Sequence, residues 1–160
     1  MINIGHWYRD MKQLIDARRY LEESVSLFPC YEGIKELICT LGEIGDRVRI
    51  KELLQDLLLL DLTNPTVFND AMSFAHENHL GAELIDLLQS LSDAQGDETL
   101  AKANCIYYAA QLLPSHDINF AKSKLAEARK IFGKLLPPEH QVFKLIRFSI
   151  RQRNLAAKKK

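Results

Sequence analysis

Two histidines in one short stretch are the nearest approach to a metal site in this sequence. His76 and His79 occur in AHENH, three residues apart, with Glu77 between them. On a helix this spacing places both imidazoles on one side, where they could form one edge of a zinc site. Zinc needs three or four ligands, and neither a second HxxH nor a cysteine lies at ligand spacing. The sequence therefore predicts no metal site, with His79 in a turn and His76 facing solvent or a groove.

The cysteines are the candidates for nucleophilic chemistry. Cys30, Cys39 and Cys105 form no CxxC pair, and an odd number favours free thiols in a reducing compartment. A nucleophilic cysteine needs a lowered pKa and a base nearby. Cys105 falls in the predicted buried stripe of its helix, whereas Cys39 lies on a different face. No GxSxG, phosphate loop, dinucleotide fingerprint or paired-carboxylate motif occurs. We therefore predict no catalytic residues and no cofactor, so the protein is not expected to be an enzyme.

Proline and glycine divide the chain into helical segments. Four stops fall at Pro29, Pro65, Pro114 and the pair Pro137 and Pro138, because proline cannot continue a helix interior. Between the stops, apolar residues recur at spacings of three and four, and no segment alternates with the period of two typical of a half-buried strand. The predicted helices cover residues 6–28, 31–43, 47–61, 65–78, 81–93, 98–113, 117–135 and 139–155. Short connections predict that successive helices pack antiparallel.

The composition is that of an average soluble globular chain. Lys plus Arg equals Asp plus Glu, 21 each, so no overall field attracts the protein to nucleic acid or to an anionic membrane. The run LLQDLLLLDL contains Asp56 and Asp61 and is much shorter than a membrane-spanning helix. The N-terminus MINIGHWYRD lacks the pattern of a secretory signal. We therefore predict a cytoplasmic protein.

An internal repeat is visible when the predicted helices are aligned. Ala17, Leu21 and Ser24 define a pattern with small or apolar residues at plus four and plus seven. The pattern returns about every 34 residues, at Ile50, Leu54 and Leu57, at Leu84, Leu88 and Leu91, and at Ala121, Leu125 and Ala128. A second pattern in the preceding helices begins at Ile34, Phe68 and Cys105. Both patterns give one repeating unit, a pair of helices.

A helix pair with this spacing resembles the tetratricopeptide repeat (TPR). The family's second-helix pattern of alanine, an aromatic, alanine and proline is matched by Ala17, Leu21, Ser24 and Pro29, with leucine in place of the aromatic. The first-helix aromatic is present as Phe68. The resemblance implies an all-α fold, a right-handed α-solenoid of antiparallel helix pairs with about seven to eight helices and a C-terminal capping helix.

The resemblance also implies a domain organisation. We predict one TPR-like domain over residues 1–157, followed by a basic tail at 158–160. The first repeat should be partial, because one helix over 6–28 leaves it without a complete first helix. The expected repeats cover approximately 1–30 (partial), 31–64, 65–101 and 102–137, with the cap at 138–157.

The first helices of stacked pairs line a concave surface, and such surfaces bind peptides. If the apolar stripe of each first helix faces the core, the neighbouring stripe lines the groove. This places eight candidate groove residues: Lys35, Cys39, Asn69, Ser73, His76, Ile106, Tyr107 and Ala110. Only Lys35 and Asn69 resemble the residues with which family members clamp a partner's terminal carboxylate, so we do not expect that kind of clamp.

The C-terminal segment allows two interpretations. From Ile118 to Lys160, Lys and Arg far outnumber the two acidic residues, Glu127 and Glu139. The part PEHQVFKLIRFSIRQRNLAAKKK predicts a basic amphipathic helix, a type that can lie on an anionic membrane or bind RNA. A solenoid also needs a terminal helix with a polar outer side to cover its last apolar face, and we favour this capping role.

The function predicted from these features is recognition of another protein or peptide by an adaptor or scaffold, without a small-molecule cofactor. The neutral net charge argues against nucleic acid or membrane as the partner, and a homodimer is compatible with the sequence. Three alternatives stay open: a small secretion-type chaperone with TPR-like repeats, a regulatory or targeting domain of a larger enzyme, and an RNA- or membrane-associated protein that acts through the basic C-terminal helix.

Overall fold

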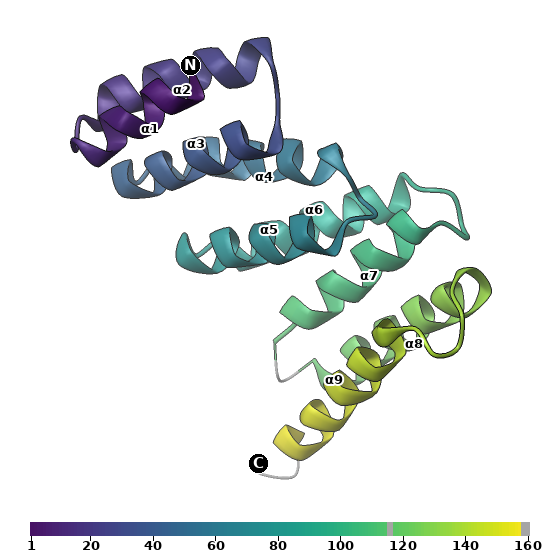
Figure 1. Cartoon of the computed structure of the whole chain (residues 1–160). Coiled ribbons are helices and arrows are strands. Elements are labelled where there is room, and N and C mark those ends of the chain that lie inside the picture. The colour runs from purple at the N-terminus through teal and green to yellow at the C-terminus, as the bar shows by residue number, and fades with distance from the viewer. Residues whose placement is uncertain (115–116, 158–160) are drawn as a thin grey trace. The chain divides into compact units, whose positions relative to one another are not determined.

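The computed structural model describes residues 1–114 and 117–157, and helix is the only regular secondary structure in these residues (Figure 1). In chain order the helices of this part are α1 (Ile2–Asp10), α2 (Leu14–Leu27), α3 (Tyr31–Ile44), α4 (Arg47–Leu60), α5 (Pro65–Glu77), α6 (Gly81–Asp93), α7 (Leu100–Leu112), α8 (Ile118–Leu135) and α9 (Gln141–Ala157). The prediction of an all-α chain whose helices follow one another through short connections is confirmed.

One predicted helix is wrong. The segment predicted as a single helix over residues 6–28 forms two helices, α1 and α2, so the described residues contain nine helices and not about seven to eight. The break lies at Lys12, which adopts a left-handed backbone with φ of 58°. Amide hydrogen bonds from Lys12 to the Arg9 carbonyl (2.8 Å) and from Gln13 to the Tyr8 carbonyl (2.9 Å) close the turn. No proline or glycine marks this turn, so it could not be predicted from local sequence signals.

The other helix ends follow their local sequence. Gly45 ends α3 in the left-handed region with φ of 85°, a conformation that glycine adopts without steric cost. Asp46 caps the next helix by accepting a hydrogen bond from the Arg49 amide at 3.1 Å. His79 takes the turn after α5 with φ of 57°, as predicted. These residues therefore position the helices that carry the candidate site.

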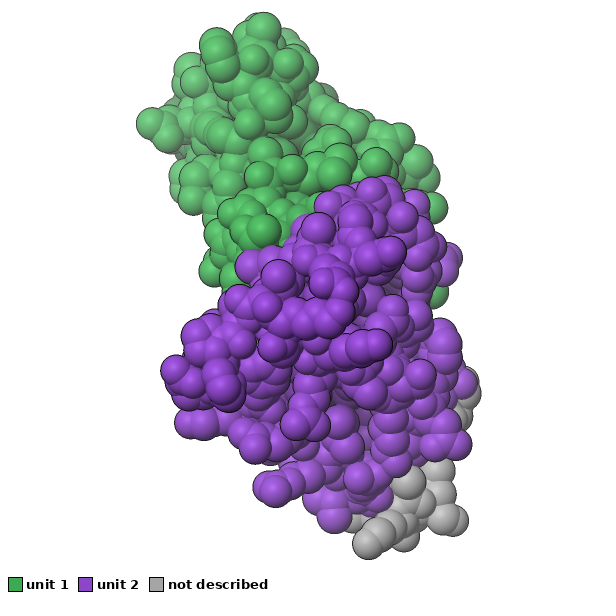
Figure 2. Space-filling model, turned by 90° about the vertical axis from the view of Figure 1, so that its right-hand side faces the viewer, with its two compact units in different colours: residues 1–84 green, residues 85–160 purple. Residues whose placement is uncertain are grey.

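The chain divides into two compact units, residues 1–84 and 85–160, which are coloured separately in Figure 2. In unit 1 each helix packs against the next one, from α1 to α5, and α1 also contacts α3, which in turn contacts α5. The first helices of successive pairs are therefore neighbours (Figure 1). The prediction of a single domain over residues 1–157 stays a prediction.

The small residues of the opening helices allow a close approach in unit 1. Ala17, Leu21 and Ser24 on α2 are all buried. Gly5 on α1 lies directly against Leu21: a Cβ atom added to Gly5 would lie 2.5 Å from the Cγ of Leu21. Any side chain at residue 5 would overlap the buried leucine, so this glycine sets the distance between α1 and α2.

Unit 2 is built around α7, which is buried on every side over residues 103–110. A helix that is apolar all round is typically a central one, and α8 packs against α7 while α9 packs against α8. Phe132 of α8 is fully buried, and its ring meets that of Tyr107 edge-on at 6.5 Å. Among the described side chains of α9, Ile146 is fully buried.

Arg153 joins α9 to the end of α7. Its guanidinium donates hydrogen bonds to the carbonyl oxygens of Ala110 (2.6 Å), Gln111 (3.2 Å) and Leu113 (3.2 Å). The last carbonyls of a helix have no partner within the helix, and a cation there also interacts favourably with the helix dipole. The inner side of α9 therefore covers α8 and caps the end of α7. Its role as the terminal cap of a solenoid stays a prediction. The predicted basic tail, 158–160, lies outside the described residues.

Candidate binding surface

Polar side chains link α1, α3 and α5, the first helices of successive helix pairs in unit 1, to one another. Glu36 on α3 accepts hydrogen bonds or ion pairs from two residues of α1, His6 at 3.1 Å and Arg9 at 3.0 Å. Lys12, in the turn after α1, pairs with Glu43 near the end of α3 at 2.7 Å. These contacts join residues about 30 positions apart in the sequence and place their side chains on one surface of α1 and α3.

The same surface continues to α5 through a cluster of three residues. The Tyr31 hydroxyl on α3 donates a hydrogen bond to the carboxylate of Asp70 on α5. The Lys35 ammonium lies 3.0 Å from the same carboxylate oxygen and 4.8 Å from the centre of the Tyr31 ring. A charge-assisted pair and a cation–π contact thus hold one lysine, one tyrosine and one aspartate together.

The charges of this cluster stabilise one another. The hydrogen bond to Asp70 raises the pKa of Lys35. Burial acts to raise the pKa of Asp70, but hydrogen bonds from Tyr31 and Lys35 outweigh it, and the pKa lies below its ordinary value. Asp70 is therefore a carboxylate at neutral pH and bridges α3 to α5.

Replacing Asp70 by Asn should lower the free energy of unfolding at pH 7 by about 0.5–1 kcal/mol, because the pair is partly exposed. Because the pKa of Asp70 is lower in the folded than in the unfolded state, its ionisation stabilises the fold at pH values above its unfolded-state pKa of about 4. This stabilisation is lost as the pH falls through the folded-state pKa. The deficit of the variant should therefore shrink as the pH is lowered from 7 towards 3 in a series of urea titrations. Asp56→Asn, at an exposed carboxylate of α4, is the matched control and should show no such trend. A deficit of equal size at every pH would contradict the assignment.

The five candidate groove residues of α3 and α5 lie on or beside this surface. Lys35 belongs to the cluster with Asp70, and Cys39 is half-buried one turn further along α3. Asn69, Ser73 and His76 are exposed on successive turns of α5. The Ser73 hydroxyl donates to the Glu77 carboxylate at 2.9 Å, within the same helix. Unit 1 therefore presents amide, hydroxyl and imidazole groups to solvent along α5.

The three candidate groove residues of α7 have a different environment. Ile106, Tyr107 and Ala110 are buried, with 3%, 8% and 0% of their surfaces exposed. Tyr107 contacts Phe132, and the Ala110 carbonyl accepts a hydrogen bond from Arg153. In this structure these residues serve the packing of unit 2, and the accessible predicted residues are those of α3 and α5.

The groups considered for metal or nucleophilic chemistry are dispersed. Within residues 1–114 and 117–157, no three His, Cys, Asp or Glu side chains are grouped so that they could hold a metal ion. Burial raises the pKa of the Cys39 thiol and raises that of Cys105 to about 11. Both thiols are therefore protonated at neutral pH, whereas a nucleophilic cysteine needs a lowered pKa.

Two residues that organise this surface were missed at the sequence level. Tyr31 and Asp70 come from different helix pairs, 39 positions apart, and each alone is an ordinary helix residue. Only the packing of α3 against α5 brings them together.

None of the described helices has both the length and the apolar character needed to cross a membrane. Comparisons of the chain with models of known protein families, with curated proteins and with solved structures gave no match.

Proposed function

We propose that this protein is a non-enzymatic scaffold that binds a segment of another protein on the surface formed by α1, α3 and α5. The observation that carries the proposal is the set of polar contacts between these first helices, which hold side chains from three helices on one surface. Helical repeat proteins use such multi-helix surfaces to bind extended or helical peptides.

The accessible groups of α5 suit this role. Asn69 is exposed, and its amide can both donate and accept a hydrogen bond from a peptide backbone. Ser73 and His76 follow on the next turns of the same helix, so the three groups lie in a row. Asp70 already holds the side chains of Lys35 and Tyr31 in place, so binding a partner would cost less side-chain entropy at these two residues.

We also propose that the chain is a TPR-like protein, folded as a right-handed α-solenoid and located in the cytoplasm. The support is the pairing of successive helices, the contacts between first helices of unit 1, and the recurrence of two apolar patterns about every 34 residues.

The test begins with a peptide selected from a random-peptide phage library on the immobilised full chain. Replacing Asn69 by Arg should weaken binding of that peptide at least about tenfold, because a bulky cation would replace a hydrogen-bonding amide on the surface. Gln55→Arg, on the exposed side of α4, is the matched control and should bind with unchanged affinity. Both variants should keep the melting temperature of the parent protein. Equal affinity of the two variants would place the binding surface elsewhere.

A further inference from the structure

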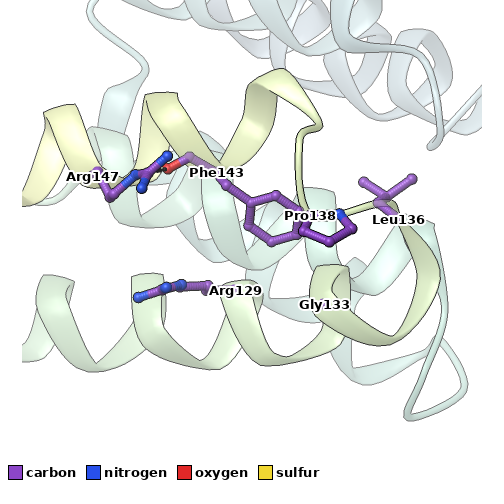
Figure 3. Close-up of a pocket in the computed structure, with 6 residues that line it drawn as sticks. All are labelled: Arg129, Gly133, Leu136, Pro138, Phe143 and Arg147. Atoms are coloured by element: carbon purple, nitrogen blue, oxygen red, sulfur yellow. Dashed lines mark hydrogen bonds between the residues drawn. The ribbon is translucent and has the colours of Figure 1, made fainter.

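A cavity in unit 2 lies between α8, α9 and the connection that joins them (Figure 3). Its volume is about 260 Å³. Two arginines, a glycine and three apolar residues line it: Arg129, Gly133, Leu136, Pro138, Phe143 and Arg147. Pockets for drug-sized ligands usually begin at about 300 Å³, so this one suits a small group.

The arginines come from the two different helices that form the walls. In Figure 3 the Phe143 ring lies between the helices, with Pro138 beside it, and both arginine side chains lie on the side of the ring away from Pro138. The Nε of Arg147 donates to the Phe143 carbonyl at 3.2 Å, one turn back in α9. This bond uses one donor of the guanidinium and leaves its terminal nitrogens available to a ligand.

The charge of the residues that line the cavity is positive. Among the described residues, no acidic side chain forms an ion pair with Arg129 or Arg147. Glu139 follows Pro138 in the connecting segment, and it too is not paired with either arginine. The acidic residue of α8, Glu127, is paired with Lys124 at 3.0 Å. Lys130, Lys144 and Arg151 add further positive charge on the same two helices.

We propose that this cavity binds a phosphate monoester attached to an aromatic ring. A phosphate monoester carries a charge of about −1.5 to −2 at neutral pH, which two guanidinium groups can balance, whereas a carboxylate needs only one. Leu136, Pro138 and Phe143 give the ring an apolar surface to contact. None of the residues that line this cavity belongs to α1, α3 or α5, so either proposal can fail without the other.

Phenyl phosphate is the probe, titrated into the isotope-labelled full chain and followed by amide chemical shifts. Saturable shifts should centre on residues 129–147. Benzoate and inorganic phosphate should bind at least about tenfold more weakly, because each lacks one part of the ligand, and phenol should cause no saturable shift.

The variants test the residues directly. Arg129→Gln and Arg147→Gln should each weaken phenyl phosphate at least about tenfold. Arg151→Gln, an exposed arginine of α9 that does not line the cavity, is the matched control and should leave affinity unchanged. Gly133→Leu should abolish binding while keeping both charges, because a Cβ at Gly133 meets no atom within 4 Å and the new side chain has room to fill the cavity. Unchanged melting temperatures would show that each variant is folded.

The source of the aromatic phosphate is distinguished by a second ligand, N-acetyl-phosphotyrosine amide. Tighter binding than phenyl phosphate would identify a phosphotyrosine side chain of a peptide, and equal or weaker binding would identify a small aryl phosphate. The proposal is overturned if phenyl phosphate causes no saturable shifts, or if Arg129→Gln and Arg147→Gln bind it as Arg151→Gln does.

Discussion

A chain that ends after Pro137 is expected to lose the stable fold of unit 2 and to aggregate. The truncation removes α9 and with it the fully buried Ile146 and the half-buried Val142, Phe143 and Ile150. At about 1.5–3 kcal/mol for each fully buried apolar side chain, and less for the others, the loss amounts to at least about 4 kcal/mol. It also exposes the apolar surface of α8. Thermal unfolding followed by circular dichroism, together with light scattering, measures both effects.

A single substitution at Arg153 tests its contact with the end of α7 separately from the packing of the rest of α9. Arg153→Ala removes the hydrogen bonds to the last carbonyls of α7 and should lower the free energy of unfolding by about 1 kcal/mol. Arg151→Ala, which is exposed on the same helix, should have no measurable effect. If the truncated chain stays monomeric and melts at the temperature of the full chain, α9 is not a structural cap.

Gly5→Ala is expected to destabilise the chain by about 1–3 kcal/mol, although alanine favours helices more than glycine does. The new methyl group would lie 2.5 Å from the Cγ of Leu21, a side chain with no exposed surface. Urea unfolding measures the loss. The variant also predicts coupling: Leu21→Ala should cost less in the Gly5→Ala background than alone, because it removes the overlap.

Gly133→Ala is the control of opposite sign. This glycine is exposed within α8, and a Cβ there meets no atom within 4 Å. Alanine should therefore stabilise the helix by about 0.5–1 kcal/mol. If both substitutions stabilise the protein, helix propensity dominates and the close approach of α1 and α2 has been overestimated.

The helices themselves could be predicted because their signals are local. Apolar spacings of three and four defined α3 to α9, and Pro65 marked the start of α5 through its own conformational preference. The turn at Lys12 escaped prediction because a lysine in the left-handed conformation has no distinctive sequence signal. The turn at Lys12 allows α1 to pack against α2, where Gly5 contacts Leu21. These two residues are distant in the sequence, so their contact has no local signal.

The candidate site was predicted only in part for the same reason. The pattern identified which stripe of α5 is accessible, and Asn69, Ser73 and His76 are indeed exposed. It could not show that Tyr31 and Asp70 meet across two helix pairs. Nor could periodicity identify α7 as a central helix. The prediction assumed one buried stripe on each helix, whereas in α7 the neighbouring stripe with Ile106 and Ala110 is buried as well. Such features depend on how many neighbours a helix has, which only the tertiary structure determines.

The most direct test of the proposed function is to map the peptide selected on the full chain by amide chemical shifts. Binding on the proposed surface predicts that the shifts cluster on α1, α3 and α5, with the largest around Asn69 and Ser73. Asn69→Arg should abolish this pattern and Gln55→Arg should leave it intact. Shifts confined to α2 and α4, or to unit 2, would contradict the proposal that the first helices form the binding surface.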